Sequence, residues 1–113
     1  MSEFTYLFRG RDTTASRDQQ QKTMQKWAAW FKELGAQGHL KEPGHPLMPG
    51  GRVVAGRKKA VSDGPFAEAK DVVGGFTVIE ARDLAQAVEL AKGCPIFEVG
   101  GSVEVREIQA FTL

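Results

Sequence analysis

The segment from Val72 to Glu80 constrains the fold more than any other part of the sequence. Val72, Phe76 and Val78 alternate with Val73, Thr77 and Ile79, so apolar side chains fall on both faces of an extended chain. A strand of this kind is typical of the centre of a sheet that is covered on both sides. The fold must therefore supply strand neighbours and two covering layers for this segment.

A first strand and a long helix are predicted before it. Phe4, Tyr6 and Phe8 recur at every second position, which places three aromatic rings on one face of a strand. Ser16 and Gln19 have the spacing of a capping box, which predicts a helix over about residues 17–36. Aromatic residues at helical spacing favour a core role over stacking on a ligand, and of Trp27, Trp30 and Phe31 the first candidate to face a partner surface is Trp30. The predicted buried stripe of this helix consists of Met24, Trp27, Ala28, Phe31 and Leu34.

Proline and glycine dominate the middle of the chain. Residues 42–46 and 49–51 contain Pro-Gly combinations that interrupt regular structure, so an exposed loop with at most one short strand is expected there. The segments Arg52–Ala55 and Lys59–Ser62 flank a three-residue turn and predict a β-hairpin.

A second helix and a last strand follow the central strand. Asp83 is a suitable N-cap, with Gln86 three residues later, and Gly93 and Pro95 end the helix. Val103 to Ile108 predicts the last strand. The expected buried stripe of this helix is Leu84, Ala87, Val88 and Ala91.

This order of elements predicts an α+β fold, a ferredoxin-like βαββαβ sandwich with an added β-hairpin. Two helices cover only one face of such a sheet, yet the central strand is apolar on both. The other face is therefore expected to pair with a second copy of the chain. A homodimer of this kind also predicts an enclosed pocket for a small molecule at the interface.

Composition narrows the function classes. The 113 residues fit one domain over 1–113, and 15 basic against 14 acidic residues give a net charge of +1, which does not favour nucleic acid as a partner. Cys94 is the single cysteine, so no intrachain disulfide is expected. No signal-peptide pattern or membrane-length apolar run is present, so a cytoplasmic protein without a membrane partner is expected.

Four motifs stand out in the sequence. They are Ser62–Lys70 (SDGPFAEAK), Gly74–Phe76, Gly93–Pro95 and Gly100–Arg106 (GGSVEVR). Together they resemble the DGPF proteins of the YCII-related family. That resemblance implies a ferredoxin-like subunit of a dimeric α/β barrel, in a superfamily with monooxygenase, isomerase and dehalogenase branches, and it does not imply one reaction. Similar domains are found beside extracytoplasmic-function sigma factors, so a sigma factor is a second candidate partner.

YCII-like relatives carry a candidate catalytic pair that this chain lacks. In those relatives a histidine lies on the first helix and an aspartate precedes the proline that ends the second. Here the first predicted helix contains no histidine, and Cys94 precedes Pro95. An activity that depends on that pair is therefore not carried over.

The candidate pocket residues are Tyr6, His45, Asp63, Phe66 and Lys70. Asp63 has a second interpretation, in which its carboxylate fixes the turn by accepting backbone amides of the following loop. Cys94 is expected to be a small buried residue and not a nucleophile. Two loop histidines, His39 and His45, give too few fixed ligands for a metal, and no cofactor motif is present.

Two functions remain open at this point. The first is a small-molecule site at the dimer, with or without catalysis by acid and base groups. The second is a regulatory or protein-interaction module linked to sigma factors. A purely structural dimer is a third reading.

Overall fold

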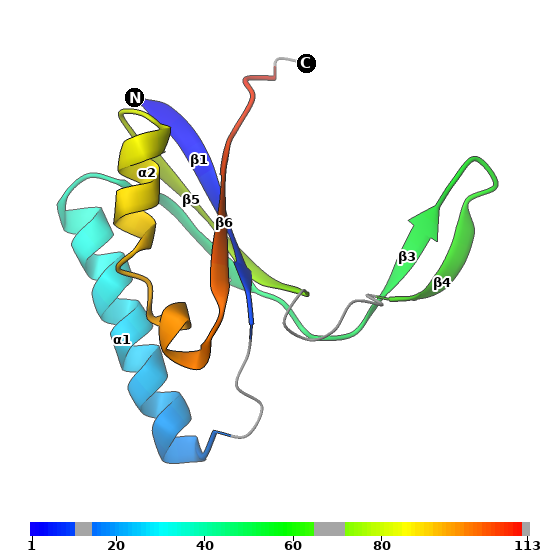
Figure 1. Cartoon of the computed structure of the whole chain (residues 1–113), viewed down its shortest axis with the longest axis horizontal. Helices are drawn as coiled ribbons and strands as arrows, with labels where there is room; N and C mark the ends of the chain where they lie inside the picture. The colour runs from blue at the N-terminus through cyan, green and yellow to red at the C-terminus, as the bar shows by residue number, and fades with distance from the viewer. Residues whose placement is uncertain (11–14, 65–71, 112–113) are drawn as a thin grey trace.

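The computed structural model of the chain describes residues 1–10, 15–64 and 72–111. Four strands form an antiparallel sheet in the order β2-β5-β1-β6, and two further strands form a separate hairpin, β3-β4 (Figure 1). The elements are β1 (Ser2–Arg9), α1 (Arg17–Ala36), β2 (Leu40–Pro46), β3 (Gly51–Ala55), β4 (Ala60–Gly64), β5 (Val73–Ala81), α2 (Leu84–Ala91), the 3-10 helix η2 (Pro95–Val99) and β6 (Ser102–Glu107).

The topology confirms the predicted fold class. β5 lies between β2 and β1, in the centre of the sheet, as its doubly apolar sequence predicts. The strand order is that of a ferredoxin-like βαββαβ sandwich, and β3-β4 is the added hairpin. None of the helices in the described part of the chain is long and apolar enough to pass through a membrane.

One face of the sheet forms the core beneath the two helices. Phe4 and Tyr6 of β1 and Ile79 of β5 are completely buried there. Thr77, the buried polar residue of this face, donates its Oγ1 hydrogen to the carbonyl oxygen of Pro43 at 2.8 Å. The Tyr6 hydroxyl donates to the carbonyl oxygen of Ala87 at 2.6 Å and so ties β1 to α2. Each buried side-chain polar group described here thus has a partner.

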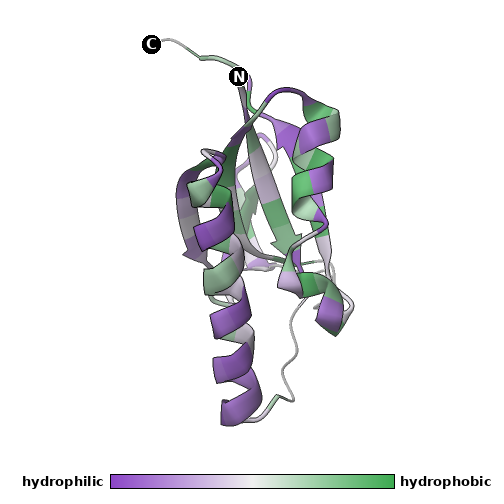
Figure 2. Cartoon of the chain, turned by 90° about the vertical axis from the view of Figure 1, so that its left-hand side faces the viewer, coloured by the Kyte–Doolittle hydropathy of each residue, from purple (hydrophilic) through white to green (hydrophobic). Residues whose placement is uncertain are grey.

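Helix α1 begins where the sequence predicts. Ser16 Oγ accepts from the Gln19 amide, and the Gln19 side chain accepts from the Ser16 amide, so the capping box is complete. The first turns of the helix are hydrophilic on all sides and remain exposed (Figure 2). The helix packs on the sheet only through its second half.

The buried face of α1 differs from the predicted stripe at three positions. Met24 and Ala28 are exposed, whereas Trp30, the aromatic residue considered first for a partner surface, is only 7% exposed. Trp30 stacks on Tyr6 with a ring-centroid distance of 5.9 Å, and its indole Nε1 donates to the carbonyl oxygen of Leu90. The indole is large enough to fill the space between α1, the sheet and α2, which makes it a core residue.

Helix α2 has the predicted cap, but only half of its predicted stripe is buried. Asp83 Oδ1 accepts from the Gln86 amide at 2.9 Å. Ala87 and Ala91 face the sheet, whereas Leu84 and Val88 are exposed. The small alanine side chains let α2 lie close to the sheet, and no further described element covers the outer side of the helix.

Strand β2 corrects the expectation of an exposed loop at residues 42–46. The segment pairs with β5 as an edge strand and accommodates its proline and glycine through two register shifts. Gly44 has φ +72°, and a Cβ built there would lie 1.8 Å from the Phe76 carbonyl oxygen, so only glycine fits. An edge strand needs hydrogen bonds on one side alone, which is why Pro43 is tolerated.

The β3-β4 hairpin confirms the predicted pairing and stands apart from the sheet and helices (Figure 1). Among the described strands, β3 and β4 pair only with each other. Gly64, the glycine of the Asp-Gly-Pro-Phe motif, packs beneath Val53: a Cβ at position 64 would lie 2.3 Å from Val53 Cγ2. This contact gives the motif glycine a packing role in the hairpin.

Candidate functional site

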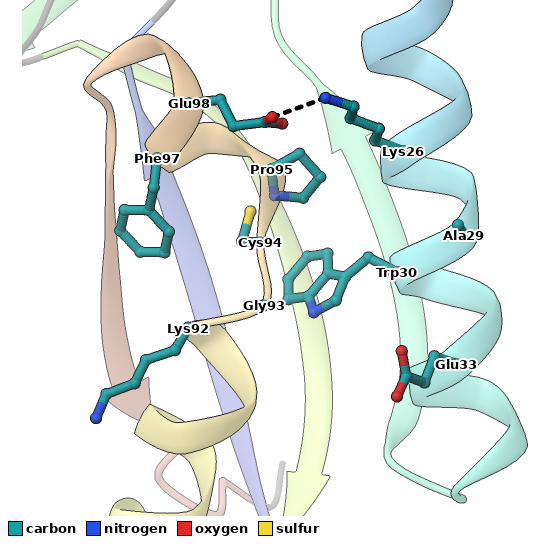
Figure 3. A pocket seen from close by; sticks show the side chains of 10 residues that line it. All are labelled: Lys26, Ala29, Trp30, Glu33, Lys92, Gly93, Cys94, Pro95, Phe97 and Glu98. Carbon is teal, nitrogen blue, oxygen red and sulfur yellow. Dashed lines mark hydrogen bonds and ion pairs between the residues drawn. The ribbon is translucent and has the colours of Figure 1, made fainter.

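A groove of about 530 Å³ lies between α1 and the segment that joins α2 to η2 (Figure 3). A smaller cavity of about 190 Å³ shares Trp30, Glu33 and Gly93 with it and extends it along α2. A volume of this size is in the range of small-molecule sites. The residues that line the larger cavity are Lys26, Ala29, Trp30, Glu33, Lys92, Gly93, Cys94, Pro95, Phe97 and Glu98.

Trp30 forms a fixed wall of the groove. Its ring stacks on Tyr6, and its Nε1 hydrogen bond to the Leu90 carbonyl, at 3.3 Å, sets the orientation of the indole. Gly93 lies against the same ring, where a Cβ would be 3.2 Å from Nε1. A side chain at position 93 would therefore crowd the indole. The groove is held in shape by core packing, which limits the entropy lost when a ligand binds.

Cys94 lies at the base of the groove, directly before η2. The side chain is buried, and burial raises the pKa of its thiol to about 12, although a backbone hydrogen bond near Ile96 acts in the opposite direction. The pKa of the Tyr6 hydroxyl is also raised, mainly by burial and to a smaller extent by the nearby Cys94. Neither group is ionised at neutral pH, so neither is a ready nucleophile or base.

Charged side chains surround the mouth of the groove. Lys26 of α1 forms an ion pair with Glu98 of η2 at 2.7 Å, which spans the groove from one wall to the other (Figure 3). Lys92 pairs with Glu89 at 2.7 Å, and the Glu33 carboxylate accepts a hydrogen bond from the Gln37 side chain. These groups are exposed enough to exchange their partners for polar groups of a ligand.

The face of the sheet opposite the helices is the second candidate surface. Thr5, Leu7, Phe76 and Val78 form its centre, and all four are only partly buried. Ion pairs flank this apolar centre at both ends. They are Arg9–Glu104 and Arg106–Glu104 at one end and Lys41–Glu3 and Lys41–Glu80 at the other. The hydrogen bond from Lys41 to Glu3 and the negative charge of Glu3 raise the pKa of Lys41.

Of the five predicted pocket residues, the three that the structure describes do not lie together in one chain. Tyr6 is buried beneath the helices, whereas His45 lies on the exposed face of the sheet with its ring centroid 6.2 Å from that of Phe76. Asp63 lies on β4, away from both. Phe66 and Lys70 fall outside the described residues. A pocket that combines them at a dimer interface stays a prediction.

Asp63 and the histidines have limited roles in what the structure describes. The Asp63 side chain is 90% exposed and pairs with Arg52 at 3.3 Å; the loop whose amides it is predicted to accept is not described. His39 Nδ1 bonds to the Glu80 carbonyl oxygen at 2.8 Å. Among residues 1–10, 15–64 and 72–111, no three His, Cys, Asp or Glu side chains form a metal-binding group.

Sequence reasoning missed the groove because its walls come from two distant segments. Lys26 and Phe97 were not singled out, and Trp30 and Cys94 were considered separately. The one available signal was positional. The candidate pair of YCII-like relatives lies on the first helix and before the proline after the second, and in this chain α1 and Cys94 both line the groove.

A match to a protein family covers nearly the full length of the chain. The family model of the YCII-related domain matches residues 4–112. This chain belongs to the YCII-related domain family. Membership agrees with the resemblance of its Asp-Gly-Pro-Phe and Gly-Gly-Ser motifs and with the βαββαβ order of its elements.

Two further comparisons concern individual proteins. None of the curated proteins matches this YCII-related domain. Among solved structures it is similar to the 5-chloro-2-hydroxyhydroquinone dehydrochlorinase of Burkholderia phenoliruptrix AC1100, solved in complex with 2,5-dihydroxybenzoquinone. The identity is 16%, the match covers 95% of this chain and 93% of that chain, and the TM-score is 0.49.

Proposed function

We propose that this YCII-related domain binds a small molecule in the groove between α1 and η2. The observation that carries the proposal is the groove itself, about 530 Å³ with a rigid aromatic wall at Trp30 and charged groups at its mouth. Convergence of a few polar groups on an apolar cavity is the usual composition of a ligand site.

The lining suggests the chemistry of the ligand. Trp30, Pro95 and Phe97 offer apolar surface to a flat or compact hydrophobic body. Glu33 and Lys92 offer one acidic and one basic group to a polar substituent. A partly apolar molecule with at least one charged or hydrogen-bonding group fits this arrangement.

Binding is better supported than catalysis. The histidine and aspartate of YCII-like relatives are absent, and the thiol at the aspartate's place is buried, with a pKa of about 12. A turnover step would need an acid or base that is ionised or protonated near neutral pH. We therefore expect the groove to recognise its ligand without help from Cys94.

The test is a thermal-shift screen with a fragment library on three proteins. Ala29 lines the groove, and Ala29→Trp fills it from an exposed position; Ala28→Trp adds the same side chain to an exposed neighbour that does not line it. Groove ligands should raise the melting temperature of the wild type and of Ala28→Trp and leave Ala29→Trp unchanged. Hits that stabilise all three proteins equally, or no hits at all, would refute the groove as the site.

We further propose that the protein acts as a cytoplasmic homodimer that pairs through the exposed face of the sheet. The partly buried Leu7, Phe76 and Val78 support this, because a second sheet would remove them from water. A pocket at that interface would contain His45, with Asp63, Phe66 and Lys70 as further candidates.

A regulatory module that acts on a sigma factor is the second candidate function. The exposed Leu84 and Val88 on the outer side of α2 favour it, since they form a small apolar surface one helical turn apart. Purified extracytoplasmic-function sigma factor is the probe. Binding that is lost in Leu84→Gln/Val88→Gln supports this role, and absence of binding by isothermal titration rejects it.

A further inference from the structure

The β3-β4 hairpin is an arm that does not pack on the described sheet and helices of its own chain. Among the described residues its strands hydrogen-bond only with each other, and the hairpin projects away from the sheet and helices (Figure 1). The root of the arm is fixed, since the Leu47 amide donates to the Gly74 carbonyl oxygen at 2.8 Å. The radius of gyration of the chain, 15.7 Å, exceeds the roughly 13 Å typical of a compact chain of this length.

The arm carries an exposed apolar pair. Val54 and Val61 are direct partners across the two strands, and they are 63% and 65% exposed. An isolated two-stranded hairpin is at best marginally stable in water. Contact with another surface would bury both valines and add the stability that the arm lacks within its own chain.

The charge of the arm is opposite to that of the rest of the chain. Residues 51–64 contain four cations, Arg52, Arg57, Lys58 and Lys59, and a single carboxylate, Asp63. Because the whole chain has 15 basic and 14 acidic residues, the remainder has 11 basic and 13 acidic residues. The arm is therefore basic and the body acidic.

The charges at the tip of the arm have no described partner. Among the described residues, no carboxylate lies within ion-pair distance of Arg57, Lys58 or Lys59. In the same part of the chain, Glu42 on β2 and Glu107 on β6 have no cation within that distance. Opposite charges of this kind can pair between molecules.

We propose that the β3-β4 arm is a clasp that docks on the acidic body of a second copy of this chain. The inference rests on the homodimer proposed above and adds a second contact to it. In a two-fold dimer the contact occurs twice, because each arm reaches the body of its partner. The valine pair favours a protein surface over a nucleic acid, whose phosphates would neutralise the cations but leave the valines in water.

The first test measures the dimer dissociation constant by sedimentation equilibrium. Val54→Ser/Val61→Ser should raise it by about tenfold or more, because two buried side chains lose apolar contact in each of two clasps. The far-UV circular dichroism of the sheet and helices should not change. A matched control is Leu84→Ser/Val88→Ser on α2, which removes two apolar side chains that are 51% and 39% exposed outside the arm and should leave the constant unchanged.

The second test uses salt. The wild-type dimer should weaken as NaCl rises from about 50 to 500 mM, since arm and body attract each other through charge. Lys58→Gln/Lys59→Gln should remove most of this dependence. Arg17→Gln/Lys22→Gln, an equal loss of charge on the exposed first turns of α1, should retain it.

The third test detects the contact directly. A nitroxide is attached to Lys58→Cys in a chain without ¹⁵N, and this chain is mixed with a ¹⁵N-labelled wild-type chain. The nitroxide should broaden amide signals from the body of the labelled partner. A monomeric wild type overturns both the clasp and the homodimer. A dimer that shows no broadening and does not respond to the arm variants overturns the clasp alone. The clasp is also overturned if the arm variants weaken binding to a DNA duplex and leave the dimer unchanged.

Discussion

The two faces of the four-stranded sheet differ in how completely the chain itself covers them. On the helix face, Phe4, Tyr6 and Ile79 are fully buried, and Thr77 has its hydrogen-bond partner. On the other face, the apolar side chains of Leu7, Phe76 and Val78 are only partly buried. We call the helix face, which the chain covers completely, the finished face, and the opposite face, which it leaves partly exposed, the unfinished face. Folding depends on the first face, and assembly is expected to depend on the second.

The largest expected effect is the loss of stability when a side chain on the finished face is truncated. Phe4→Ala should lower the free energy of unfolding by about 3–5 kcal/mol, because it removes a ring from a site with no exposure to water. Leu7→Ala, on the same strand but the opposite face of the sheet, should cost the isolated subunit much less. Chemical denaturation at a protein concentration low enough to give monomers compares the two. Equal losses would contradict the difference between the faces.

A charge on the unfinished face should disrupt assembly and leave the fold intact. Leu7→Glu places a carboxylate in the proposed interface, and the dimer dissociation constant should rise by at least about a hundredfold. Val88→Glu makes a similar change on the exposed side of α2 and serves as the control. Analytical ultracentrifugation with circular dichroism separates dissociation from unfolding. A Leu7→Glu protein that remains dimeric would place the interface elsewhere.

A smaller effect is expected where β1 is tied to α2. Tyr6→Phe retains the ring and removes the hydroxyl that donates to the Ala87 carbonyl oxygen. The loss should be about 1–1.5 kcal/mol in urea unfolding, the usual contribution of one buried hydrogen bond. Dimerisation should not change, because this hydroxyl lies on the helix face. A change in the dimer constant without a loss of stability would contradict that placement.

The smallest effect is a pH dependence at Cys94. The folded chain holds the pKa of the thiol at about 12, whereas the unfolded thiol ionises near 9. The unfolded state therefore loses a proton between these values and the folded state does not, so stability falls as pH rises. Between pH 9 and 10 the wild type should lose about 1 kcal/mol more than Cys94→Ala. Parallel losses in both proteins, or rapid labelling of the native thiol at neutral pH, would show that Cys94 is accessible.

The sequence predicts the regular elements well because their signals are local. Ser16 with Gln19 and Asp83 with Gln86 each satisfy helix amides within one turn, and these caps occur as predicted. The centre of the sheet is equally legible, since both faces of β5 are apolar. Such signals do not depend on the rest of the fold.

The failures of prediction have a common physical origin in tertiary packing. β2 reads as a loop because Pro43 and Gly44 disfavour a strand, yet register shifts at a sheet edge accommodate both. Trp30 is buried and Val88 is exposed, the reverse of what was expected, because the distance between each helix and the sheet decides which side chains fit beneath it. The groove was missed for the same reason, since Trp30 and Cys94 meet only after α1 and η2 have packed on the sheet.

The mass of the wild-type protein in solution tests the central claim most directly. The chain has a mass of 12.3 kDa, and a sheet with one finished and one unfinished face predicts a particle of twice that mass in sedimentation equilibrium at micromolar concentration. The particle should dissociate on Leu7→Glu and not on Val88→Glu. A wild-type protein that remains at 12.3 kDa over the whole micromolar range would contradict the account, because the apolar exposed face would then have no partner copy to cover it.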